Sequence, residues 1–365
     1  MTSRPNITFS SCYYQVKNRH GTEKHFEWFR DFIKVVNRFY LVIYTGENEY
    51  PAIQNEIDTI GEEDTRNKIK VIVKPFTKFH NYNHERFWRS NNERSENKIR
   101  DIADWRLSML WCEKTHFVKE TIEKQYFETE YYGWCDIGYF RDTLSVSTAS
   151  TVSTVSPEYR NLIREYWPNP NIIEHLHKEK VYYGCNIQPK KMESSTIWMV
   201  RHFDPSNLVS NTGVPRDMYH PDAHYFSGGF YITGREKALW WCHTFQRALE
   251  KYINAGAFLK DDQHIIAYCI FTGSRDRDFR IVYSNDNNSI DKPWFLFRDF
   301  LLRWASNERT SERANERTNE LKDINIFYIY FHFLPSQLPN DYRDHYGWVG
   351  KPTLPNFYSH RRCFT

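Results

Sequence analysis

Asp136 is the first residue in the chain whose setting could support chemistry. It directly follows the apolar segment YYGWC, residues 131–135, and Gly138 comes two positions later. In an open α/β sheet, ligands bind beyond the carboxyl ends of the strands. A carboxylate there can hold a divalent cation that neutralises a diphosphate leaving group, and the glycine permits a close approach of the backbone to a ligand. An ordinary turn explains the same residues equally well.

Gly228 and Gly229 form the second feature, inside the strand-like sequence FSGGFYITG at 226–234. Glycines within a strand cost stability, so they often mark a bulge or a point where a ligand approaches the backbone. Of these two interpretations, the bulge is the simpler.

Asp261, Asp262 and Gln263 form the third feature, at the start of an apolar segment of helical length. One of the carboxylates could accept the proton of an acceptor hydroxyl, or bind sugar hydroxyls together with Gln263. Capping of the helix needs only one acid. The pair followed by a glutamine therefore favours a site.

His345 is the fourth feature, in the sequence HYGWVGKP at 345–352. A neutral histidine can ligate a cation, and Lys351 could lie near a phosphate. An exposed histidine in a polar tail is the alternative, and this residue alone does not require more.

The elements that would position these residues follow the pattern of a mostly parallel sheet. Apolar runs predict strands at 7–14, 39–45, 68–74, 131–135, 181–187, 225–233 (broken by the two glycines) and 280–284. Apolar residues at helical spacing predict helices at 22–36, 101–124, 235–254 and 261–271. We therefore predict one Rossmann-like α/β domain over 1–365, with a mostly parallel mixed sheet flanked by helices, a core at about 7–285 and a C-terminal extension at 286–365.

Three further segments have no evident place in that core. Residues 79–91 are rich in aromatic and polar residues and predict a loop. Residues 145–156 (SVSTASTVSTVS) and 306–320 (SNERTSERANERTNE) are low-complexity insertions, and the second repeats Glu-Arg every four residues. The Glu-Arg segment has no core residue, so we expect a solvated helix or a disordered stretch rather than a partner-binding element.

Composition excludes some classes of protein. The chain has 365 residues with 49 Lys and Arg against 46 Asp and Glu, so a concentrated basic stripe for nucleic acid is not expected. The seven cysteines are scattered without a CxxC pair, which fits reduced thiols and a cytoplasmic location. The N-terminal residues do not have the pattern of a signal peptide, and no apolar stretch approaches ~18 residues, so no transmembrane segment is expected.

The order of these motifs resembles the HtrL/YibB family. The resemblance rests on LSMLWCEKTHFVKETI (107–122), YYGWCDIGYFR (131–141), FSGGFYITG (226–234) and DDQ (261–263), and it covers about residues 7–285. It implies a GT-A glycosyltransferase-like fold and a link to glycan synthesis.

A looser similarity runs to glycogenin-type glycosyltransferases, which carry Asp-x-Asp for a metal, an Asp-Gln pair and a late His-x5-Lys-Pro. Asp136 matches the first motif, Asp262-Gln263 the second, and His345 with Lys351-Pro352 the third. The chain departs from the first motif, because position 138 is Gly and position 134 is Trp. The second metal carboxylate is therefore absent, which leaves the need for a metal open.

Together these resemblances imply a hexosyltransferase-like enzyme that uses a nucleotide-sugar donor, most commonly a uridine diphosphate sugar, and a glycan, lipid or protein acceptor. Mn²⁺ or Mg²⁺ would be held by Asp136 and His345, and Asp261 or Asp262 would be catalytic. The donor-binding residues would be Trp134, Gly138, Gly228, Gly229, Gln263 and Lys351. The alternative is a non-catalytic protein that binds glycans or nucleotide sugars on the same fold. A nucleic-acid-binding protein is a third reading, against which the balanced charge argues.

Overall fold

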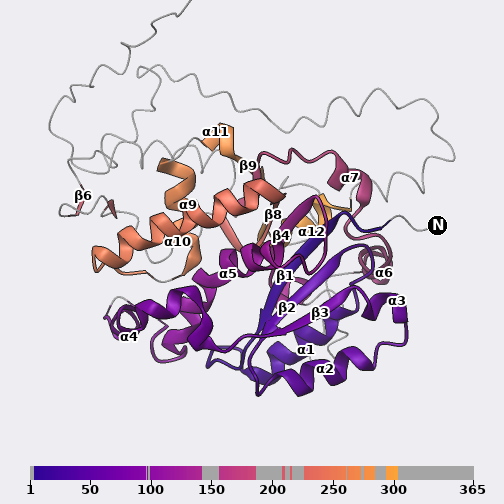
Figure 1. Cartoon of the computed structure of the whole chain (residues 1–365), viewed down its shortest axis with the longest axis horizontal. Coiled ribbons are helices and arrows are strands. Elements are labelled where there is room, and N and C mark those ends of the chain that lie inside the picture. Colours follow the sequence, from indigo (N-terminus) through magenta and orange to yellow (C-terminus); the bar gives the residue numbers. More distant parts are fainter. Residues whose placement is uncertain are drawn as a thin grey trace, which may run out of the picture. The chain divides into compact units, whose positions relative to one another are not determined.

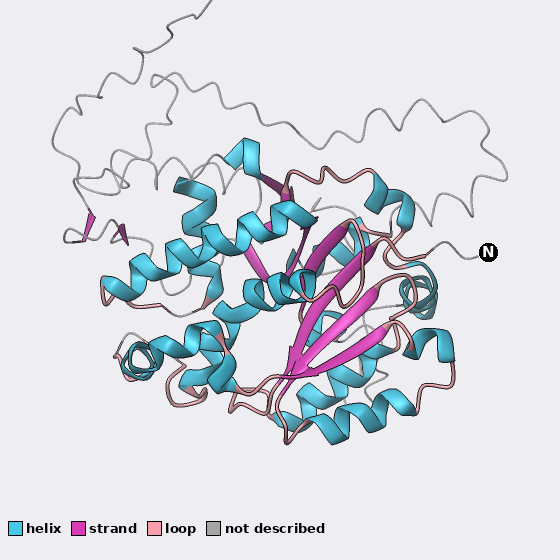
Figure 2. Ribbon diagram, in the orientation of Figure 1, coloured by secondary structure: helices cyan, strands magenta, loops and turns pink. Residues whose placement is uncertain are grey.

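Seven strands form the central sheet of the protein (Figure 1, Figure 2). The computed structural model describes residues 4–95, 97, 99–141, 156–185, 208–209, 214–215, 226–259, 261–272, 275–283 and 293–302. The strands of the sheet are β1 (Ile7–Tyr13), β2 (Tyr40–Thr45), β3 (Ile69–Val73), β4 (Tyr131–Cys135), β5 (Val181–Cys185), β8 (Phe226–Gly234) and β9 (Phe279–Tyr283). A separate two-stranded ribbon pairs β6 (Leu208–Val209) with β7 (Val214–Pro215).

The strand order is β3-β2-β1-β4-β8-β5-β9. Neighbours are parallel except that β8 runs antiparallel to both β4 and β5. The predicted α/β class with a mostly parallel mixed sheet is therefore confirmed. Because β8 is reversed, its first residues lie beside the carboxyl end of β4, so Gly228 and Gly229 reach the same sheet edge as Asp136.

The longer helices have clear bounds. They are α1 (Thr22–Ile33), α2 (Tyr50–Asp58), α4 (Glu85–Asn92), α5 (Trp105–Glu123), α6 (Pro157–Tyr166), α9 (Arg235–Asn254) and α10 (Asp262–Thr272). The short helical segments are α3 (Glu63–Arg66), η1 (Phe76–Lys78), η2 (His80–His84), η3 (Ile137–Phe140), α7 (Pro170–Glu174), α11 (Arg275–Asp278), η6 (Pro293–Phe295) and α12 (Leu296–Phe300).

The sheet is buried on both faces. Successive residues of each strand point to opposite faces, so Trp134 belongs to one hydrophobic cluster and Cys135 to the other. Helices α5, α9 and α10 cover the Trp134 face, whereas α1, α2, α6, α7 and α12 cover the other. Figure 1 shows α5, α9 and α10 together and α1 with α2 on the opposite side of the strands.

Helix α5 differs from its prediction at its N-terminus. It begins at Trp105 because the side chain of Asp104 accepts a hydrogen bond from the backbone N–H of Arg106, which caps the helix. Ile102, inside the predicted range 101–124, therefore lies outside α5 and is 44% exposed. Met109 and Phe117, within α5, are fully buried.

Three other segments differ from the sequence prediction. The predicted loop at 79–91 contains η2 and α4, because buried Trp88 gives that segment an apolar side. The predicted helix at 22–36 ends at Ile33. The predicted break in the strand at 225–233 is also wrong, since β8 is continuous over Phe226–Gly234.

The glycines of β8 nevertheless coincide with a bulge. On the side of β5, Tyr183 pairs with Tyr231 and Cys185 pairs with Phe226. Residues 227–230 therefore lie opposite Gly184 alone, so the chain makes extra room at Gly228 and Gly229.

Several predictions fall outside the described residues. The insertion at 306–320 lies there, as do His345 and Lys351, and so does the insertion at 145–156 except for Ser156, which caps α6. The extent of a single domain over 1–365 stays a prediction, since all described residues belong to one compact unit, Met1–Asn315. None of the described helices combines the length and apolar character of a bilayer span.

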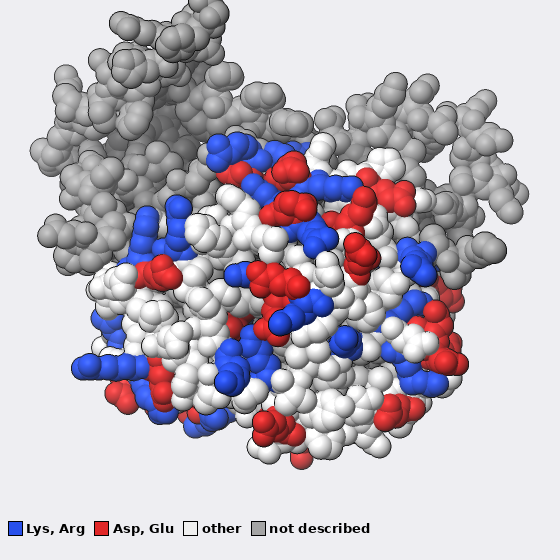
Figure 3. Space-filling model, viewed as in Figure 1, with Lys and Arg blue, Asp and Glu red and all other residues white. Residues whose placement is uncertain are grey.

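Charge on the described surface is mixed. Figure 3 shows Lys and Arg interspersed with Asp and Glu over the visible face. The sequence has nearly equal numbers of basic and acidic residues, and the described part of this face has no large area of a single charge sign.

Candidate functional site

Asp136 leaves the sheet directly after β4. Its backbone N–H donates to the carbonyl of Gly229 at 2.9 Å, which extends the β4–β8 ladder by one residue. The indole Nε1 of Trp134 donates to Asp136 Oδ1 at 2.5 Å. Trp134 is buried whereas the Asp136 side chain is 36% exposed, so the indole orients a carboxylate whose outer part meets solvent.

Lys114 joins that carboxylate to a second one. It lies on α5, its side chain is 8% exposed, and its Nζ is 3.2 Å from Asp136 Oδ1 and 3.1 Å from Asp262 Oδ2. The same Nζ donates to the carbonyl of Gly228 at 2.8 Å. We call Lys114, Asp136, Asp262 and the Gly228 carbonyl the Lys114 site. Residues from α5, β8, α10 and the position after β4, which are distant in sequence, thus meet at one ammonium group.

Gly228 and Gly229 make room for the two carboxylates. A Cβ atom at Gly228 would lie 2.7 Å from Asp262 Oδ1. A Cβ atom at Gly229 would lie 3.2 Å from Asp136 Oδ2 and 3.3 Å from Trp294 Nε1. The sequence left a bulge or a close approach to a ligand as alternatives here, and the structure has a bulge together with a close approach of the protein's own side chains.

The two acidic residues at the start of α10, Asp261 and Asp262, make different contacts. Asp261 Oδ1 accepts the backbone N–H of Gln263 at 3.2 Å, the interaction of a capping residue. Asp262, whose side chain is 6% exposed, pairs with Lys114 instead. Of the two predicted catalytic residues, Asp262 therefore belongs to the Lys114 site and Asp261 supports the helix. Gln263 follows them and is buried.

The charges of the site favour a protonated lysine and a proton-exchanging aspartate. Burial raises the pKa of Asp262 to about 7, and the nearby Lys114 only partly offsets it. Burial disfavours the charged form of Lys114, but Asp136 and Asp262 outweigh it and raise the pKa of the ammonium. Asp262 is thus a group whose proton can leave or return near neutral pH.

Two other predicted site residues, Gly138 and Trp134, are not among the oxygen partners of the Lys114 ammonium. Gly138 lies in η3, where an added Cβ would come within 3.0 Å of the Trp28 ring. Trp134 is buried beneath the site, with Lys114 Nζ 5.6 Å from its ring centroid, and it acts by orienting Asp136. Their part in donor binding stays a prediction.

The residues that would hold a divalent cation do not fit one well. Asp136 and Asp262 already share the Lys114 ammonium, and His345 lies outside the described residues. Among the described residues no group of three or more His, Cys, Asp or Glu could serve as metal ligands. A divalent ion about 4 Å from an ammonium would be repelled by roughly 8 kcal/mol at an effective dielectric constant of about 20, twice the value for two unit charges.

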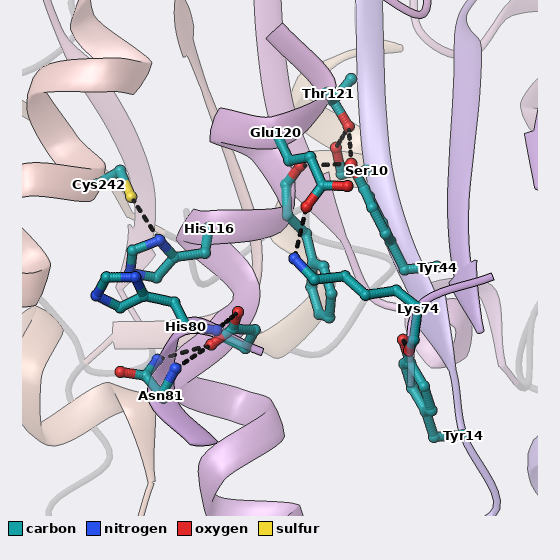
Figure 4. Close-up of polar contacts among 12 residues, drawn as sticks. Ser10, Tyr14, Tyr44, Lys74, His80, Asn81, His116, Glu120, Thr121 and Cys242 are labelled. Carbon is teal, nitrogen blue, oxygen red and sulfur yellow. Dashed lines mark hydrogen bonds and ion pairs between the residues drawn. The ribbon is translucent and has the colours of Figure 1, made fainter. Parts of the chain in front are cut away.

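A second polar region involves other residues of α5, among them His116 and Glu120 (Figure 4). A cleft of about 450 Å³, here called the lysine cleft, is lined by Val73, Lys74, Lys78, His80, His116, Lys119, Glu120, Glu123 and Lys124. At the cleft, the rings of His80 and His116 stack with centroids 4.0 Å apart. Buried His116 also contacts Gln246 Oε1 at 3.0 Å and Cys242 Sγ at 3.6 Å.

Neither Lys114 nor Trp294 was predicted from the sequence to be a site residue. Lys114 precedes Phe117 and Val118 by three and four residues, so a lysine occupies the apolar stripe of a helix. That signal was available, because a lysine at a core position requires a buried partner. Trp294 gave no comparable signal, since only the fold brings η6 next to Gly229.

Comparison with known proteins finds only distant similarity. No family model matches the chain, and no curated protein matches it. Among solved structures, mouse xyloside xylosyltransferase 1 shares 12% identity over 77% of this chain and 85% of its own, with a TM-score of 0.37. The galactosyltransferase LgtC shares 11% identity over 76% and 73%, also with a TM-score of 0.37.

A third similar structure is 4-diphosphocytidyl-2C-methyl-D-erythritol synthase from Anaerococcus prevotii. It shares 11% identity over 82% of this chain and 99% of its own, with a TM-score of 0.33. Similarity at this level does not establish a family, and the resemblance to the HtrL/YibB family stays a prediction.

Proposed function

We propose that the protein transfers a sugar from a nucleotide-activated donor to an acceptor hydroxyl at the Lys114 site. The observation that carries the proposal is the buried Lys114, which holds Asp136 and Asp262 together at the carboxyl edge of β4. Ligands of α/β proteins bind at such an edge. An ion triad buried there is costly unless its geometry is well satisfied, so it is more readily explained by function than by stability.

Each acidic residue has a role that suits sugar chemistry. The outer part of Asp136 is exposed and can accept hydrogen bonds from sugar hydroxyls. Asp262 has its pKa raised by burial to about 7, so it can accept the proton of a hydroxyl near neutral pH. Lys114 keeps both carboxylates in place while this proton moves.

The donor class that we propose rests on the resemblance of the sequence motifs to glycosyltransferases. A uridine diphosphate hexose is the first donor to test, with a glycan, lipid or protein as acceptor. Gln263 and the backbone at Gly228 and Gly229 are close enough in the chain and sheet to contribute to its binding. A cytoplasmic location is proposed with it, supported by the free cysteines among the described residues.

A non-catalytic glycan-binding protein is the second candidate. It is favoured by Gly138, which stands where a second metal carboxylate would be, and by the engagement of both acids with Lys114. Such a protein would keep the fold and bind sugars without turnover.

A thermal-shift screen separates the two candidates. The purified chain is heated with uridine diphosphate hexoses, uridine diphosphate and free oligosaccharides, each in EDTA and in Mn²⁺. A nucleotide sugar should raise the melting temperature saturably, because a ligand that binds the native state stabilises it. A shift with oligosaccharides alone would favour the glycan-binding candidate, and the Asp136→Asn variant should lose whichever shift occurs at this site.

A further inference from the structure

Three oxygen atoms converge on the Lys114 ammonium. Gly228 O is 2.8 Å from Nζ, Asp262 Oδ2 is 3.1 Å away and Asp136 Oδ1 is 3.2 Å away. Two carboxylates and a backbone carbonyl are the ligand types that hard cations such as Mg²⁺, Mn²⁺ and Ca²⁺ prefer. The three donors of a lysine match these three acceptors in number.

We propose that the Lys114 ammonium takes the place of a divalent cation between Asp136 and Asp262, and that this closes the carboxylate pair to metal. The exposed part of Asp136 then receives neutral hydroxyl groups of a sugar rather than a metal ion. The ligand class rests on the proposed function, whereas the exclusion of a cation rests only on the geometry of the Lys114 site.

The surroundings hold the ammonium in that position. Lys114 comes from the sheet-facing side of α5 and its Nζ lies 5.6 Å from the ring centroid of Trp134. Trp134 in turn donates to Asp136 Oδ1, the oxygen that faces Lys114. To bind between the carboxylates, a metal ion would have to displace a buried lysine from three partners at once.

The charge balance supports a neutral ligand. One ammonium and two ionised carboxylates leave a single negative charge, and protonation of Asp262 removes it. Neither state carries the net positive charge that would attract an anionic group to the exposed side of Asp136. A half-exposed carboxylate in such a site is suited to hydroxyl donors.

The test measures Mn²⁺ binding directly, through the electron paramagnetic resonance signal of free Mn²⁺. The wild-type chain is titrated alone and with saturating uridine diphosphate, beside Asp136→Asn, Asp262→Asn and Lys114→Ala. Lys119→Ala is the matched control, because Lys119 is on the same helix but is 42% exposed and outside the Lys114 site. The titrations without nucleotide involve no donor or acceptor, so they are independent of the proposed function.

Beyond the Mn²⁺ that uridine diphosphate binds in a titration without protein, we expect no saturable Mn²⁺ site in the wild type or in Lys119→Ala, with or without the nucleotide. Lys114→Ala should gain one Mn²⁺ site, at least tenfold tighter than any wild-type binding, and Asp262→Asn added to it should remove that site. Micromolar Mn²⁺ binding by the wild type that Asp136→Asn abolishes would overturn the proposal. A folded Lys114→Ala that gains no Mn²⁺ site would overturn it as well.

If Lys114→Ala does not fold, the comparison of the wild type with Asp136→Asn decides the question alone. Donor binding that is equal in EDTA and in Mn²⁺ supports both proposals. Donor binding that requires Mn²⁺ and is lost in Asp136→Asn overturns the cation replacement and leaves sugar transfer standing. Absence of any nucleotide-sugar binding in both conditions overturns the sugar-transfer proposal and, with it, the hydroxyl ligand.

Discussion

The two faces of α5 solve the problem of buried polar groups differently. On the sheet-facing side, Lys114 is charged, nearly inaccessible and satisfied by three oxygen atoms. On the other side, His116 is buried and kept uncharged, while the lysines of the lysine cleft stay at least partly open to solvent. Burying a charge requires full compensation, whereas a group that can lose its proton escapes that requirement.

The difference between the two faces indicates which of them binds a ligand. The lysine cleft has internal ion pairs, Lys74 with Glu120 and Lys119 with Glu123, and these have ordinary structural explanations. The Lys114 site has no such explanation, since a lysine and two acids converge there from three elements. Buried ion pairs contribute little net stability, so their retention at a sheet edge points to function.

Removing the lysine on each face should give the largest contrast. Lys114→Met leaves two carboxylates in a buried site without a counter-ion, and we expect a loss of about 3–5 kcal/mol in the free energy of unfolding. Lys119→Met removes only an exposed pair and should cost less than about 1 kcal/mol. Urea denaturation of both variants at pH 7.5 measures the difference. Equal losses would show that the two faces do not differ in the way described.

The pH dependence of stability should have opposite signs on the two faces. Burial raises the pKa of Asp262 to about 7, above its value in the unfolded chain. The native state therefore binds more protons between about pH 4 and 7, and this group's contribution falls as pH rises through that window. Burial lowers the pKa of His116 to about 3, so its contribution falls as pH decreases below about 6.5.

Two variants separate these contributions. Asp262→Asn should flatten the decline of stability towards pH 7, and His116→Gln should flatten the decline towards pH 4, each by a few kcal/mol at most. His243→Gln is the control for the second, because His243 lies on α9 and is exposed. Urea midpoints from pH 4 to 8 provide the measurement, and a slope unchanged by either variant would contradict the assignment for that residue.

The glycines beside the Lys114 site should show the smallest effects. Gly228→Ala places a Cβ atom 2.7 Å from Asp262 Oδ1 and forces a buried carboxylate to move, whereas the Cβ atom of Gly229→Ala meets Asp136 Oδ2 at 3.2 Å. We expect a cost of about 1–3 kcal/mol for the first variant and less for the second. Melting temperatures rank them, and a larger cost at Gly229 would mean that Trp294 is held more firmly than Asp136.

Much of the fold could be predicted from the sequence because it depends on local pattern. The strands at β1, β2 and β3 are apolar runs of strand length, and α9 was predicted with its observed bounds. The loop at 79–91 was mispredicted because its helical side is set by a single buried aromatic residue, Trp88. Periodicity is weak evidence over so short a segment.

The candidate site could be predicted only in part. Asp136 and Asp262 were found because each acid stands at the end or start of an apolar element. Their common partner Lys114 was not, because a contact between residues 114 and 262 depends on the reversed β8 and the packing of α5. A divalent cation was predicted at Asp136, and the structure has the Lys114 ammonium beside that carboxylate. The expected metal ligand His345 falls outside the described residues.

The most direct test of sugar transfer at this site is the release of uridine diphosphate from uridine diphosphate hexoses. The wild-type chain, Asp262→Asn and Asp261→Asn are compared at pH 7.5 in EDTA and in Mn²⁺, with product sugars identified by mass spectrometry. Asparagine keeps the capping oxygen at position 261, so that variant should retain most of the activity. We expect turnover by the wild type and Asp261→Asn and a loss of at least 100-fold in Asp262→Asn, in line with the loss of an acid–base group. Undiminished turnover in Asp262→Asn, or no turnover of any donor by the wild type, would contradict it.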